Sequence, residues 1–309
     1  MNWQRELKKE LRLNFKGDYK FGEFLSRHTT FRIGGECSLW CEPEDLDSLR
    51  FILKYKKCRN IPLFVIGEGS NVLVRDKGFR GIVIHLDSSY FKRIEFKDRY
   101  ILAGSGAKLR EIVRLVPRKN LGGIEFLAGI PGSLGGAIMM NAGVAEIFQG
   151  QNLKFKNIGN LVDSITIMDY NGNTRNLNRD EIKFGYRSCK LSKCIILSVL
   201  LKLERKRREK ILEMIRRFLE YRRNTQDLRY PSAGCIFKNP KGDSAGRLIE
   251  ACGLKGKRTG DAQISSKHAN FIINTKDAKA KDVLKLMKII QRKVYGKYRV
   301  SLEPEIRVV

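Results

Sequence analysis

The chain has 309 residues, of which 42% are hydrophobic, and it carries a formal net charge of +28. This length suits two or three packed units, because single hydrophobic cores stop growing at about 250–300 residues. The longest uncharged apolar stretch, Cys194 to Leu201, is too short to span a bilayer, and Met1 leads into charged residues rather than a signal-peptide core. We therefore expect a cytoplasmic protein with no membrane partner.

The cysteines and histidines suggest neither a disulfide framework nor a metal centre. Seven cysteines are present without a C-x-x-C pair, and only Cys37/Cys41 and Cys189/Cys194 lie close in sequence. No zinc-ligand spacing follows from this pattern. The three histidines are scattered along the chain, so we expect no metal.

The first part of the chain, residues 21–88, reads as a small unit of sheet and helix. Hydrophobic runs predict strands at 63–66 and 82–84, and a helix fits residues 45–55 between glycine-rich turns. The first strand leads directly into Gly67-Glu68-Gly69-Ser70-Asn71. This loop is the first of two glycine-rich segments that follow hydrophobic runs.

The second part, residues 89–203, contains further strands and the second glycine-rich loop. Strands are predicted at 100–103, 164–168 and 195–199, and the Asn171-Gly172 dipeptide predicts a hairpin turn. The second loop runs from Ala128 to Gly136, and Asn141-Ala142-Gly143 follows it.

The third part begins with a dense run of basic residues from Lys202 to Arg223. Apolar residues recur through this run at helical spacing, namely Ile211, Met214, Ile215, Phe218 and Leu219. The pattern predicts an amphipathic helix with a solvated basic face. No recognition-helix, zinc-finger or aromatic RNA-binding signature accompanies it, so we expect no specific nucleic-acid partner. A basic field also suits substrates that carry phosphates.

After this helix, the spacing of apolar residues predicts helices at 244–252 and 280–294, with a strand at 271–273 between them. We expect an α+β fold, with a smaller domain at about 206–297.

The segment Pro231–Pro240 places one thiol, Cys235, between an Ala-Gly step and a Lys-Asn-Pro turn. Turn residues of this kind around a small reactive side chain indicate an exposed site rather than a core strand, with Ile236 and Phe237 as apolar support. A structural cysteine beside a loop is the alternative, because a free cysteine is usually a small buried hydrophobe.

The glycine-rich loops indicate a phosphate-containing ligand, because backbone N–H groups in such loops can approach phosphate oxygens closely. Ordinary tight turns are the alternative for either loop alone. Val72 stands where a G-x-G-x-x-G pattern needs glycine, and no G-x-x-x-x-G-K-[ST] sequence occurs. A Rossmann fold and a P-loop are therefore disfavoured, and two such loops favour an extended diphosphate cofactor.

The sequence resembles the UDP-N-acetylenolpyruvoylglucosamine reductase (MurB) family from about residue 25 to the C-terminus. The segments that carry the resemblance occur in the family's order: His28–Gly35, Gly67–Asn71, Gly129–Gly143, Phe184–Ser188, Pro231–Pro240, Lys267–Phe271 and Leu302–Arg307.

The resemblance implies an FAD-binding fold of the vanillyl-alcohol-oxidase (PCMH) type with two subdomains, plus a smaller α+β substrate-binding domain. We place the FAD-binding subdomains at residues 1–88, with an N-terminal extension, and 89–205. The substrate-binding domain then spans 206–297, and the strand with the catalytic glutamate spans 298–309. The implied reaction is NADPH-dependent reduction of UDP-N-acetylglucosamine-enolpyruvate to UDP-N-acetylmuramate, a peptidoglycan precursor. A monomer is expected.

Three residues match the family's catalytic positions. Arg187 resembles the arginine that stabilises charge, and Glu305 the glutamate that works with it on the enolate. Cys235 stands where the family usually has a serine that protonates C2. Without the resemblance, Arg187 would pass as a surface ion pair and Glu305 as a salt bridge to Arg307.

The resemblance also implies residues that bind substrate and cofactor. The expected substrate contacts are Tyr186, Lys238 and Asn239. The expected FAD contacts are Arg32, Gly67, Gly69, Ser70, Asn71, Ile130, Pro131, Gly132 and Ser133.

The chain departs from the family pattern at three places. Cys235 keeps proton donation possible, because a thiol with a pKa of about 8.5 is mostly protonated at neutral pH. Lys238 is a cation that would lower this pKa. Glu68 replaces a common glycine, and Val144-Ala145 stand where a tyrosine is common, which puts one substrate contact in doubt.

Two other functions would explain only part of these sequence features. Another FAD oxidoreductase of this fold would keep the glycine-rich loops but has no reason to keep Arg187, Cys235 and Glu305 together. A basic binding protein without enzymatic activity would purify without colour.

Overall fold

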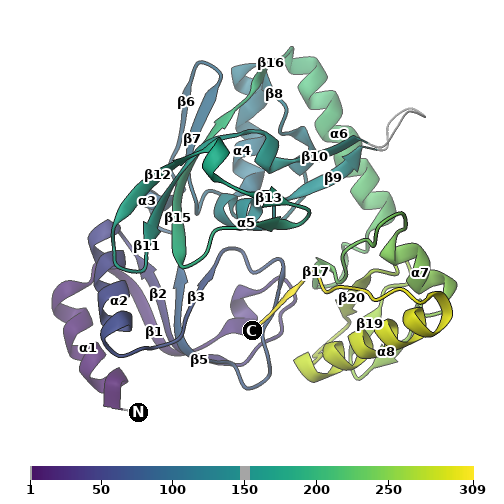
Figure 1. Ribbon diagram of the computed structural model, residues 1–309, viewed down its shortest axis with the longest axis horizontal. Helices are drawn as coiled ribbons and strands as arrows, with labels where there is room; N and C mark the ends of the chain where they lie inside the picture. Colours follow the sequence, from purple (N-terminus) through teal and green to yellow (C-terminus); the bar gives the residue numbers. More distant parts are fainter. Residues whose placement is uncertain (1, 147–153) are drawn as a thin grey trace. The chain divides into compact units, whose positions relative to one another are not determined.

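The computed structural model describes residues 2–146 and 154–309 (Figure 1). The chain divides into two compact units, each built from three separate segments. The first unit comprises Met1–Phe21, Leu39–Gly67 and Gly81–Glu220. The second comprises Gly22–Ser38, Glu68–Arg80 and Tyr221–Val309.

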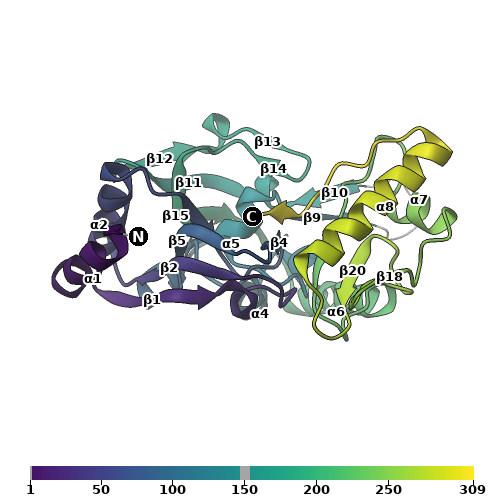
Figure 2. The same cartoon turned by 90° about the horizontal axis from the view of Figure 1, so that it is seen from below.

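The N-terminal sheet has the strand order β1-β2-β5-β3. Its strands are β1 (Gly17–Phe24), β2 (Glu36–Pro43), β3 (Leu63–Ile66) and β5 (Phe79–His85). Helices α1 (Asn2–Asn14) and α2 (Leu46–Cys58) lie side by side in the first unit (Figure 2). Leu7 and Leu11 of α1 join Leu49, Ile52 and Leu53 of α2 in one buried cluster, which explains why both helices are amphipathic.

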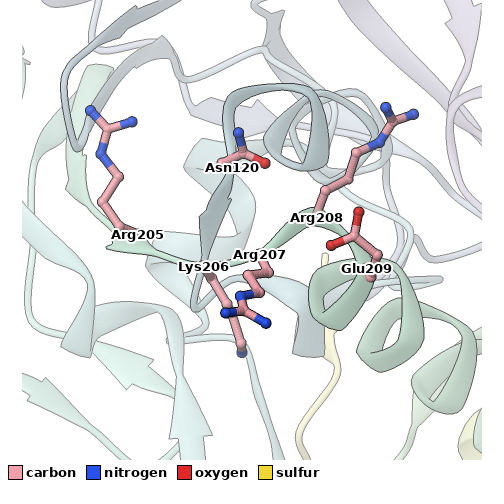
Figure 3. A pocket seen from close by; sticks show the side chains of 6 residues that line it. All are labelled: Asn120, Arg205, Lys206, Arg207, Arg208 and Glu209. Carbon is pink, nitrogen blue, oxygen red and sulfur yellow. The ribbon is translucent and has the colours of Figure 1, made fainter.

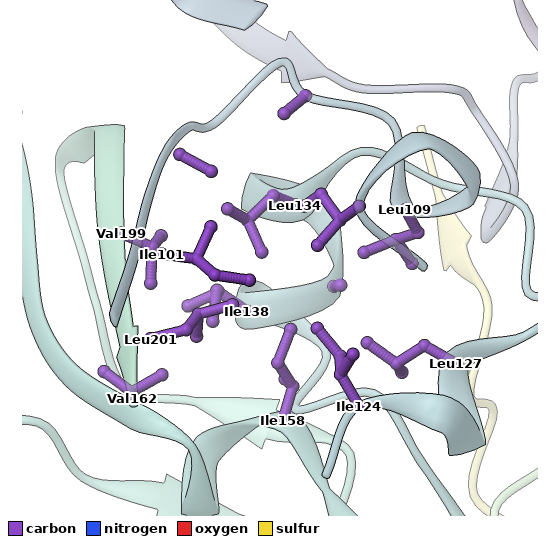
Figure 4. Close-up of a cluster of buried hydrophobic side chains, with 14 of the residues drawn as sticks. Ile101, Leu109, Ile124, Leu127, Leu134, Ile138, Ile158, Val162, Val199 and Leu201 are labelled. Atoms are coloured by element: carbon purple, nitrogen blue, oxygen red, sulfur yellow. The ribbon is translucent and has the colours of Figure 1, made fainter. Parts of the chain in front are cut away.

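The second sheet of the first unit has the order β12-β11-β15-β7-β6 and is antiparallel throughout. Its strands are β6 (Ile94–Lys97), β7 (Tyr100–Gly104), β11 (Val162–Asp169), β12 (Thr174–Asn178) and β15 (Cys194–Lys202). Leu134 and Ile138 of helix α5 (Leu134–Met139) pack with Ile101, Val199 and Leu201 of the sheet (Figure 4).

Shorter elements complete the first unit. The helices are α3 (Ser89–Lys92), α4 (Leu109–Leu115) and α6 (Arg208–Thr225), of which α6 continues into the second unit. The short strands are β8 (Leu121–Gly122), β9 (Gly143–Glu146), β10 (Lys154–Asn157), β13 (Phe184–Gly185), β14 (Ser188–Cys189) and β16 (Glu204–Arg205). Single 3₁₀ turns lie at Val116–Lys119, Glu125–Leu127, Ile158–Asn160 and Arg179–Glu181.

The second unit contains a four-stranded sheet of order β17-β20-β19-β18, which is antiparallel. The strands are β17 (Ser232–Cys235), β18 (Arg258–Thr259), β19 (Ala262–Ile264) and β20 (Phe271–Asn274). Helices α7 (Ala245–Ala251) and α8 (Ala280–Tyr298) pack in the same buried cluster as Ile236, Phe237 and Ile272. The short parallel pair β4 (Val72–Leu73) and β21 (Arg307–Val308) and the 3₁₀ turn Leu25–His28 also belong to this unit.

The sequence patterns located most of these elements. The predicted strands at 63–66, 82–84, 100–103, 164–168, 195–199 and 271–273 are confirmed as parts of β3, β5, β7, β11, β15 and β20. The predicted helices at 45–55, 244–252 and 280–294 correspond to α2, α7 and α8, and the Asn171-Gly172 turn joins β11 to β12.

The predicted basic helix is wrong at its start and in one of its apolar positions. Helix α6 begins at Arg208, because Leu201 and Leu203 are buried and alternate with exposed residues in strand fashion. Ile211 and Phe218 are buried, as predicted, but Leu219 is 40% exposed.

The subdomain boundaries predicted at residues 88, 205 and 297 were assigned by what each part is expected to bind. They stay a prediction. They divide the chain into consecutive segments, whereas the second compact unit also includes residues 22–38 and 68–80. Among the helices of the described residues, none is both long and apolar enough to cross a bilayer.

Candidate active site

Cys235 is the last residue of β17, which forms one edge of the sheet in the second unit. The pairing register with β20 shifts between Ser232 and Cys235, and Gly234 has a φ of +73°. A bulge of this kind redirects the side chains of its strand, and the positive φ explains the glycine. The segment Pro231–Pro240, predicted to be an exposed site, thus contains an edge strand. The irregular end of this strand leaves Cys235 half-buried.

The residues after Cys235 hold it in place. Ile236 and Phe237 are fully buried, as predicted for its apolar support. The buried side chain of Asn270 accepts a hydrogen bond from the Phe237 N–H (3.0 Å) and donates one to the Phe237 carbonyl (2.7 Å). Asn270 thus supplies hydrogen-bond partners to both backbone groups of Phe237, just beyond the end of β17.

We expect Asn270→Ala to lower the free energy of unfolding by about 2–4 kcal/mol, because it leaves two buried backbone groups of Phe237 without partners. Urea denaturation followed by circular dichroism measures this loss. Asn176→Ala, at an exposed position of β12, serves as the control and should change stability by less than about 0.5 kcal/mol. Equal stabilities of the Asn270 and Asn176 variants would contradict this role.

Glu305 lies beside the Cys235 segment through backbone hydrogen bonds. The Glu305 N–H donates to the Ile236 carbonyl (2.8 Å), and the Lys238 N–H donates to the Glu303 carbonyl (2.9 Å). Phe237 and Pro304 form an isolated β-bridge between these two bonds. The second unit therefore brings two of the three predicted catalytic residues to adjacent backbone positions.

Asn71, predicted to contact the cofactor, joins the same assembly. Its side-chain amide donates to the Glu305 carbonyl (3.1 Å), and its own carbonyl accepts from the Arg307 N–H (3.0 Å). The parallel pairing of β21 with β4 continues this contact at Val72. One predicted cofactor loop is thus fixed against the strand that carries Glu305.

The motif at 28–35 packs against both of these segments. The Thr30 N–H donates to the Gly69 carbonyl (3.2 Å), and the Thr30 hydroxyl donates to the Ser232 carbonyl of β17 (2.7 Å). Gly69 has a φ of +60°, and a Cβ there would collide with the His28 carbonyl. Arg32 adopts a φ of +56°, which places it at a tight backbone turn. Arg32, Gly69, Ser70 and Asn71 therefore belong to one connected part of the second unit.

The other predicted cofactor residues belong to the first unit. Ser133 is the N-cap of helix α5, and a Cβ on Gly67 would collide with its hydroxyl, so these two residues of the first unit lie in close contact. Ile130, Pro131 and Gly132 immediately precede Ser133. The requirement for glycine at position 67 is therefore explained by this steric contact rather than by turn geometry.

A buried hydroxyl near these loops fits a bound cofactor. The Ser105 Oγ is buried and has no hydrogen-bond partner in the described structure, and Ser105 Cβ is 2.9 Å from the position of a Cβ on Gly135. A buried hydroxyl without a hydrogen-bond partner destabilises the folded state unless a bound ligand supplies the partner. The residues present therefore suit a diphosphate cofactor such as FAD. Ser105 was not predicted as a site residue from the sequence, although its position between Gly104 and Gly106 was a signal.

Arg187 and Tyr186 form the tip of the hairpin made by β13 and β14. Arg187 has a φ of +51° and donates to the Gly143 carbonyl (2.6 Å), and its guanidinium lies 5.6 Å from the Tyr186 ring centroid. Asn141 fixes the hairpin by donating to the Gly185 carbonyl (2.9 Å). The first unit thus joins the Asn141–Gly143 and Phe184–Ser188 motifs, and it holds Arg187 in a backbone conformation that non-glycine residues rarely adopt.

Lys238 and Asn239, predicted as substrate contacts, also make structural bonds. The Lys238 ammonium lies 2.5 Å from the Glu303 carboxylate, and the Asn239 amide oxygen accepts from the Ala245 N–H at the start of α7 (3.0 Å). The Lys238 charge is therefore shared with a carboxylate, which weakens its expected influence on Cys235.

Arg222 is a second cation near Cys235 that was not predicted from the sequence. Burial lowers the pKa of the Arg222 guanidinium, while the negative charge of an ionised Cys235 would raise it. The Nε of Arg222 on α6 and the Oε1 of Gln226, which immediately follows α6, are both buried without hydrogen-bond partners in the described structure. Position 222 continues the buried stripe of Ile211 and Phe218, so a charged residue on an apolar stripe was the available signal.

The predicted site residues thus form two groups. The second unit contains Cys235, Glu305, Lys238, Asn239, Arg32, Gly69, Ser70 and Asn71. The first contains Arg187, Tyr186, Gly67, Ile130, Pro131, Gly132 and Ser133. Each group is assembled by its own backbone contacts.

Residues 38–178 match the family model of an FAD binding domain, which defines the chain as a flavoprotein. Residues 226–309 match the model of the UDP-N-acetylenolpyruvoylglucosamine reductase C-terminal domain. The reductase of that name from Pelobacter propionicus is 42% identical, and the alignment covers 96% of this chain and 97% of that protein. The Clostridium tetani reductase is 39% identical over 94% of this chain and 92% of its own length.

A solved structure agrees with these matches. The crystal structure of the Thermus caldophilus UDP-N-acetylenolpyruvylglucosamine reductase (MurB) has a TM-score of 0.78 and 34% identity, covering 95% of this chain and 99% of that one. The chain belongs to the UDP-N-acetylenolpyruvoylglucosamine reductase family. The predicted family, enzyme class, α+β fold and FAD cofactor are confirmed.

Proposed function

We propose that this chain reduces the enolpyruvyl group of UDP-N-acetylglucosamine-enolpyruvate to UDP-N-acetylmuramate in the cytoplasmic synthesis of peptidoglycan precursors. The chemistry that FAD would supply when bound is hydride transfer, with NADPH as the source of the electrons and C3 of the enolpyruvyl group as the acceptor. The observation that carries the proposal is the backbone bond between Glu305 and Ile236, which holds Glu305 beside Cys235. One chain contains all the proposed residues, so we propose that it acts as a monomer.

Cys235 is the proposed proton donor to C2. Hydride addition at C3 leaves negative charge on C2 and the adjacent carboxylate, so turnover requires an acid within reach of C2. A thiol meets this need at neutral pH, because its ordinary pKa of about 8.5 keeps it mostly protonated. The irregular end of β17 supports this role, since it leaves the thiol half-buried and fixed by buried neighbours.

Arg187 and Glu305 are proposed to act on the charge that develops during reduction. A guanidinium can hold a carboxylate with two parallel bonds, which suits the enolate and carboxylate of this intermediate. The hairpin supports this role for Arg187, because its positive φ and its bond to Gly143 fix the direction of the side chain. Tyr186 is 47% exposed at the same tip and is proposed to contact substrate, as are Lys238 and Asn239.

The FAD is proposed to lie against the backbone of the two glycine-rich loops. The residues proposed to contact it are Gly67, Ile130, Pro131, Gly132, Ser133, Arg32, Gly69, Ser70 and Asn71. The Ser105 hydroxyl would gain a partner.

Arg222 is proposed to bind an anionic group of the substrate, because its buried Nε has no partner in the described structure. We expect Arg222→Met to raise KM about 10–100-fold, the value of one charge-assisted hydrogen bond, with a smaller change in kcat. Steady-state kinetics at varied UDP-sugar concentration measure this. Arg217→Met is the matched control, because Arg217 is exposed on the same helix and pairs with Glu213. An unchanged KM for Arg222→Met would remove Arg222 from the site.

Another FAD oxidoreductase with a different substrate is the alternative. The two are distinguished by reducing the enzyme with NADPH under anaerobic conditions and then adding the enolpyruvyl substrate. Rapid return of the oxidised flavin absorbance, with formation of UDP-N-acetylmuramate, supports the proposal. A flavin that NADPH reduces but only oxygen reoxidises would favour the alternative.

A further inference from the structure

A basic pocket lies in the first unit, where β16 meets the beginning of α6. Its cavity volume is about 450 Å³, and it is lined by Asn120, Arg205, Lys206, Arg207, Arg208 and Glu209 (Figure 3). Arg205 and Arg208 extend on either side of Asn120 in this view. None of these residues takes part in the proposed reduction, so the pocket needs its own explanation.

The charge of this region is strongly unbalanced. Between positions 202 and 210 the chain has six basic and two acidic residues. Arg205 is paired with Asp98 (2.6 Å) and Lys206 with Glu125 (3.0 Å). Arg207 and Arg208 are both exposed, and no carboxylate in the described part of the chain pairs with either of them. The pocket therefore presents two guanidinium groups for an outside anion.

The same side of α6 exposes leucines between its arginines. Arg208, Leu212, Arg216 and Leu219 are spaced by four, four and three residues, which places them on one flank of the helix. Leu212 is 37% exposed and Leu219 is 40% exposed, although the neighbouring stripe is buried in the core. We call these four residues, together with Arg207, which immediately precedes the helix, the α6 flank.

Acidic residues border the flank on one side, and one of them, Glu209, also lines the pocket. Glu209, Glu213 and Glu220 follow the flank in angular order, and Glu213 is paired with Arg217 (2.5 Å). The flank itself has three arginines and no carboxylate. The α6 flank therefore combines positive charge with apolar side chains that are exposed to solvent.

We propose that the α6 flank docks the enzyme on a membrane surface rich in anionic phospholipids. An amphipathic helix binds such a surface when arginines meet the headgroup phosphates and large apolar side chains enter the interface. Arg207 and Arg208 line the pocket and extend in different directions, so each would meet a headgroup phosphate of its own (Figure 3). The docking is peripheral, since the other side of α6 packs in the protein core.

The exposed leucines favour lipid over nucleic acid as the partner. Binding to nucleic acid rests on contacts to phosphates and on stacking of aromatic rings against bases, and the α6 flank has no aromatic residue to stack. Leucines add nothing to such contacts, whereas they lower the free energy of an interfacial helix. The expectation from sequence that the chain has no membrane partner stays a prediction, and the vesicle experiment below decides between it and this proposal.

Co-sedimentation with vesicles tests the proposal on the full-length holoenzyme. Vesicles of phosphatidylglycerol and phosphatidylcholine are compared with vesicles of phosphatidylcholine alone at increasing salt concentration. We expect binding only to the anionic vesicles, weakened more than about tenfold by Arg207→Glu with Arg208→Glu. Leu212→Ser with Leu219→Ser should weaken it several-fold at the same net charge.

The whole chain is basic, so a control with the same charge change is essential. Lys285→Glu with Lys288→Glu makes that change on exposed positions of α8, outside the flank. Substrate turnover without vesicles should stay unchanged in all variants, which shows that they fold. Equal weakening by the α8 control would overturn the proposal. So would binding of single-stranded RNA with the same dependence on the arginines but not on the leucines.

Discussion

Cys235→Ala is expected to lower kcat by about 10²–10⁴-fold, whereas Cys235→Ser should retain substantial activity. Alanine removes the proposed proton donor to C2, while serine restores the hydroxyl that the family usually has at this position. Because the side chains differ by one atom at a half-buried position, neither change should disturb Ile236 or Phe237. Steady-state NADPH oxidation in the presence of the enolpyruvyl substrate measures both variants.

Other cysteines of the chain provide the control for this experiment. Burial raises the pKa of the Cys37 thiol to about 12 and that of Cys189 to about 11, so neither is a reactive thiol. Cys252, half-buried at the end of α7, is the better match, and Cys252→Ala should leave kcat unchanged. An active Cys235→Ala enzyme would exclude Cys235 from proton transfer and leave that step to another group.

Arg187→Met should reduce kcat by about 10²–10³-fold, because it removes the cation proposed to stabilise the enolate and carboxylate in the transition state. Arg187→Lys should restore only part of this loss, since an ammonium cannot make two parallel bonds to a carboxylate. The flavin absorbance spectrum should stay unchanged in both variants, and kcat and KM should be measured separately.

Arg175→Met is the control for Arg187, because Arg175 is exposed on β12 and has no proposed role. If Arg187→Met changed KM alone, Arg187 would bind the substrate equally in its ground and transition states. If it changed neither parameter, the hairpin tip would have a structural function only.

The sequence predicted most of the secondary structure, because its hydrophobic periodicity is regular. Leu63–Ile66 and Phe271–Asn274 are apolar runs with turn residues on each side, and such runs form buried strands. The beginning of α6 was missed because the basic run starts inside β15, which ends at Lys202, and continues through β16, a strand of only two charged residues (Glu204–Arg205). The exposure of Leu219 was missed because helical spacing alone does not show how wide the buried stripe is.

Site residues that lie in recognisable motifs were predicted from the sequence. Features that depend on contacts between distant parts of the chain were not. Cys235 and Glu305 stood out by their motifs, but their adjacency depends on bonds between residues about seventy positions apart. The buried Arg222 was not predicted, because it resembles the other arginines of its basic run. Likewise, the steric need for Gly67 depends on Ser133, a contact that no local pattern contains.

The most direct test of the proposed reaction is NADPH oxidation by the purified flavoprotein without oxygen, with and without UDP-N-acetylglucosamine-enolpyruvate. We expect oxidation only when this substrate is present, with one UDP-N-acetylmuramate formed for each NADPH consumed. If the flavin is bound and reducible but the enolpyruvyl substrate accepts no electrons, the proposed reaction is wrong, and Cys235 then serves a different chemistry on the same fold.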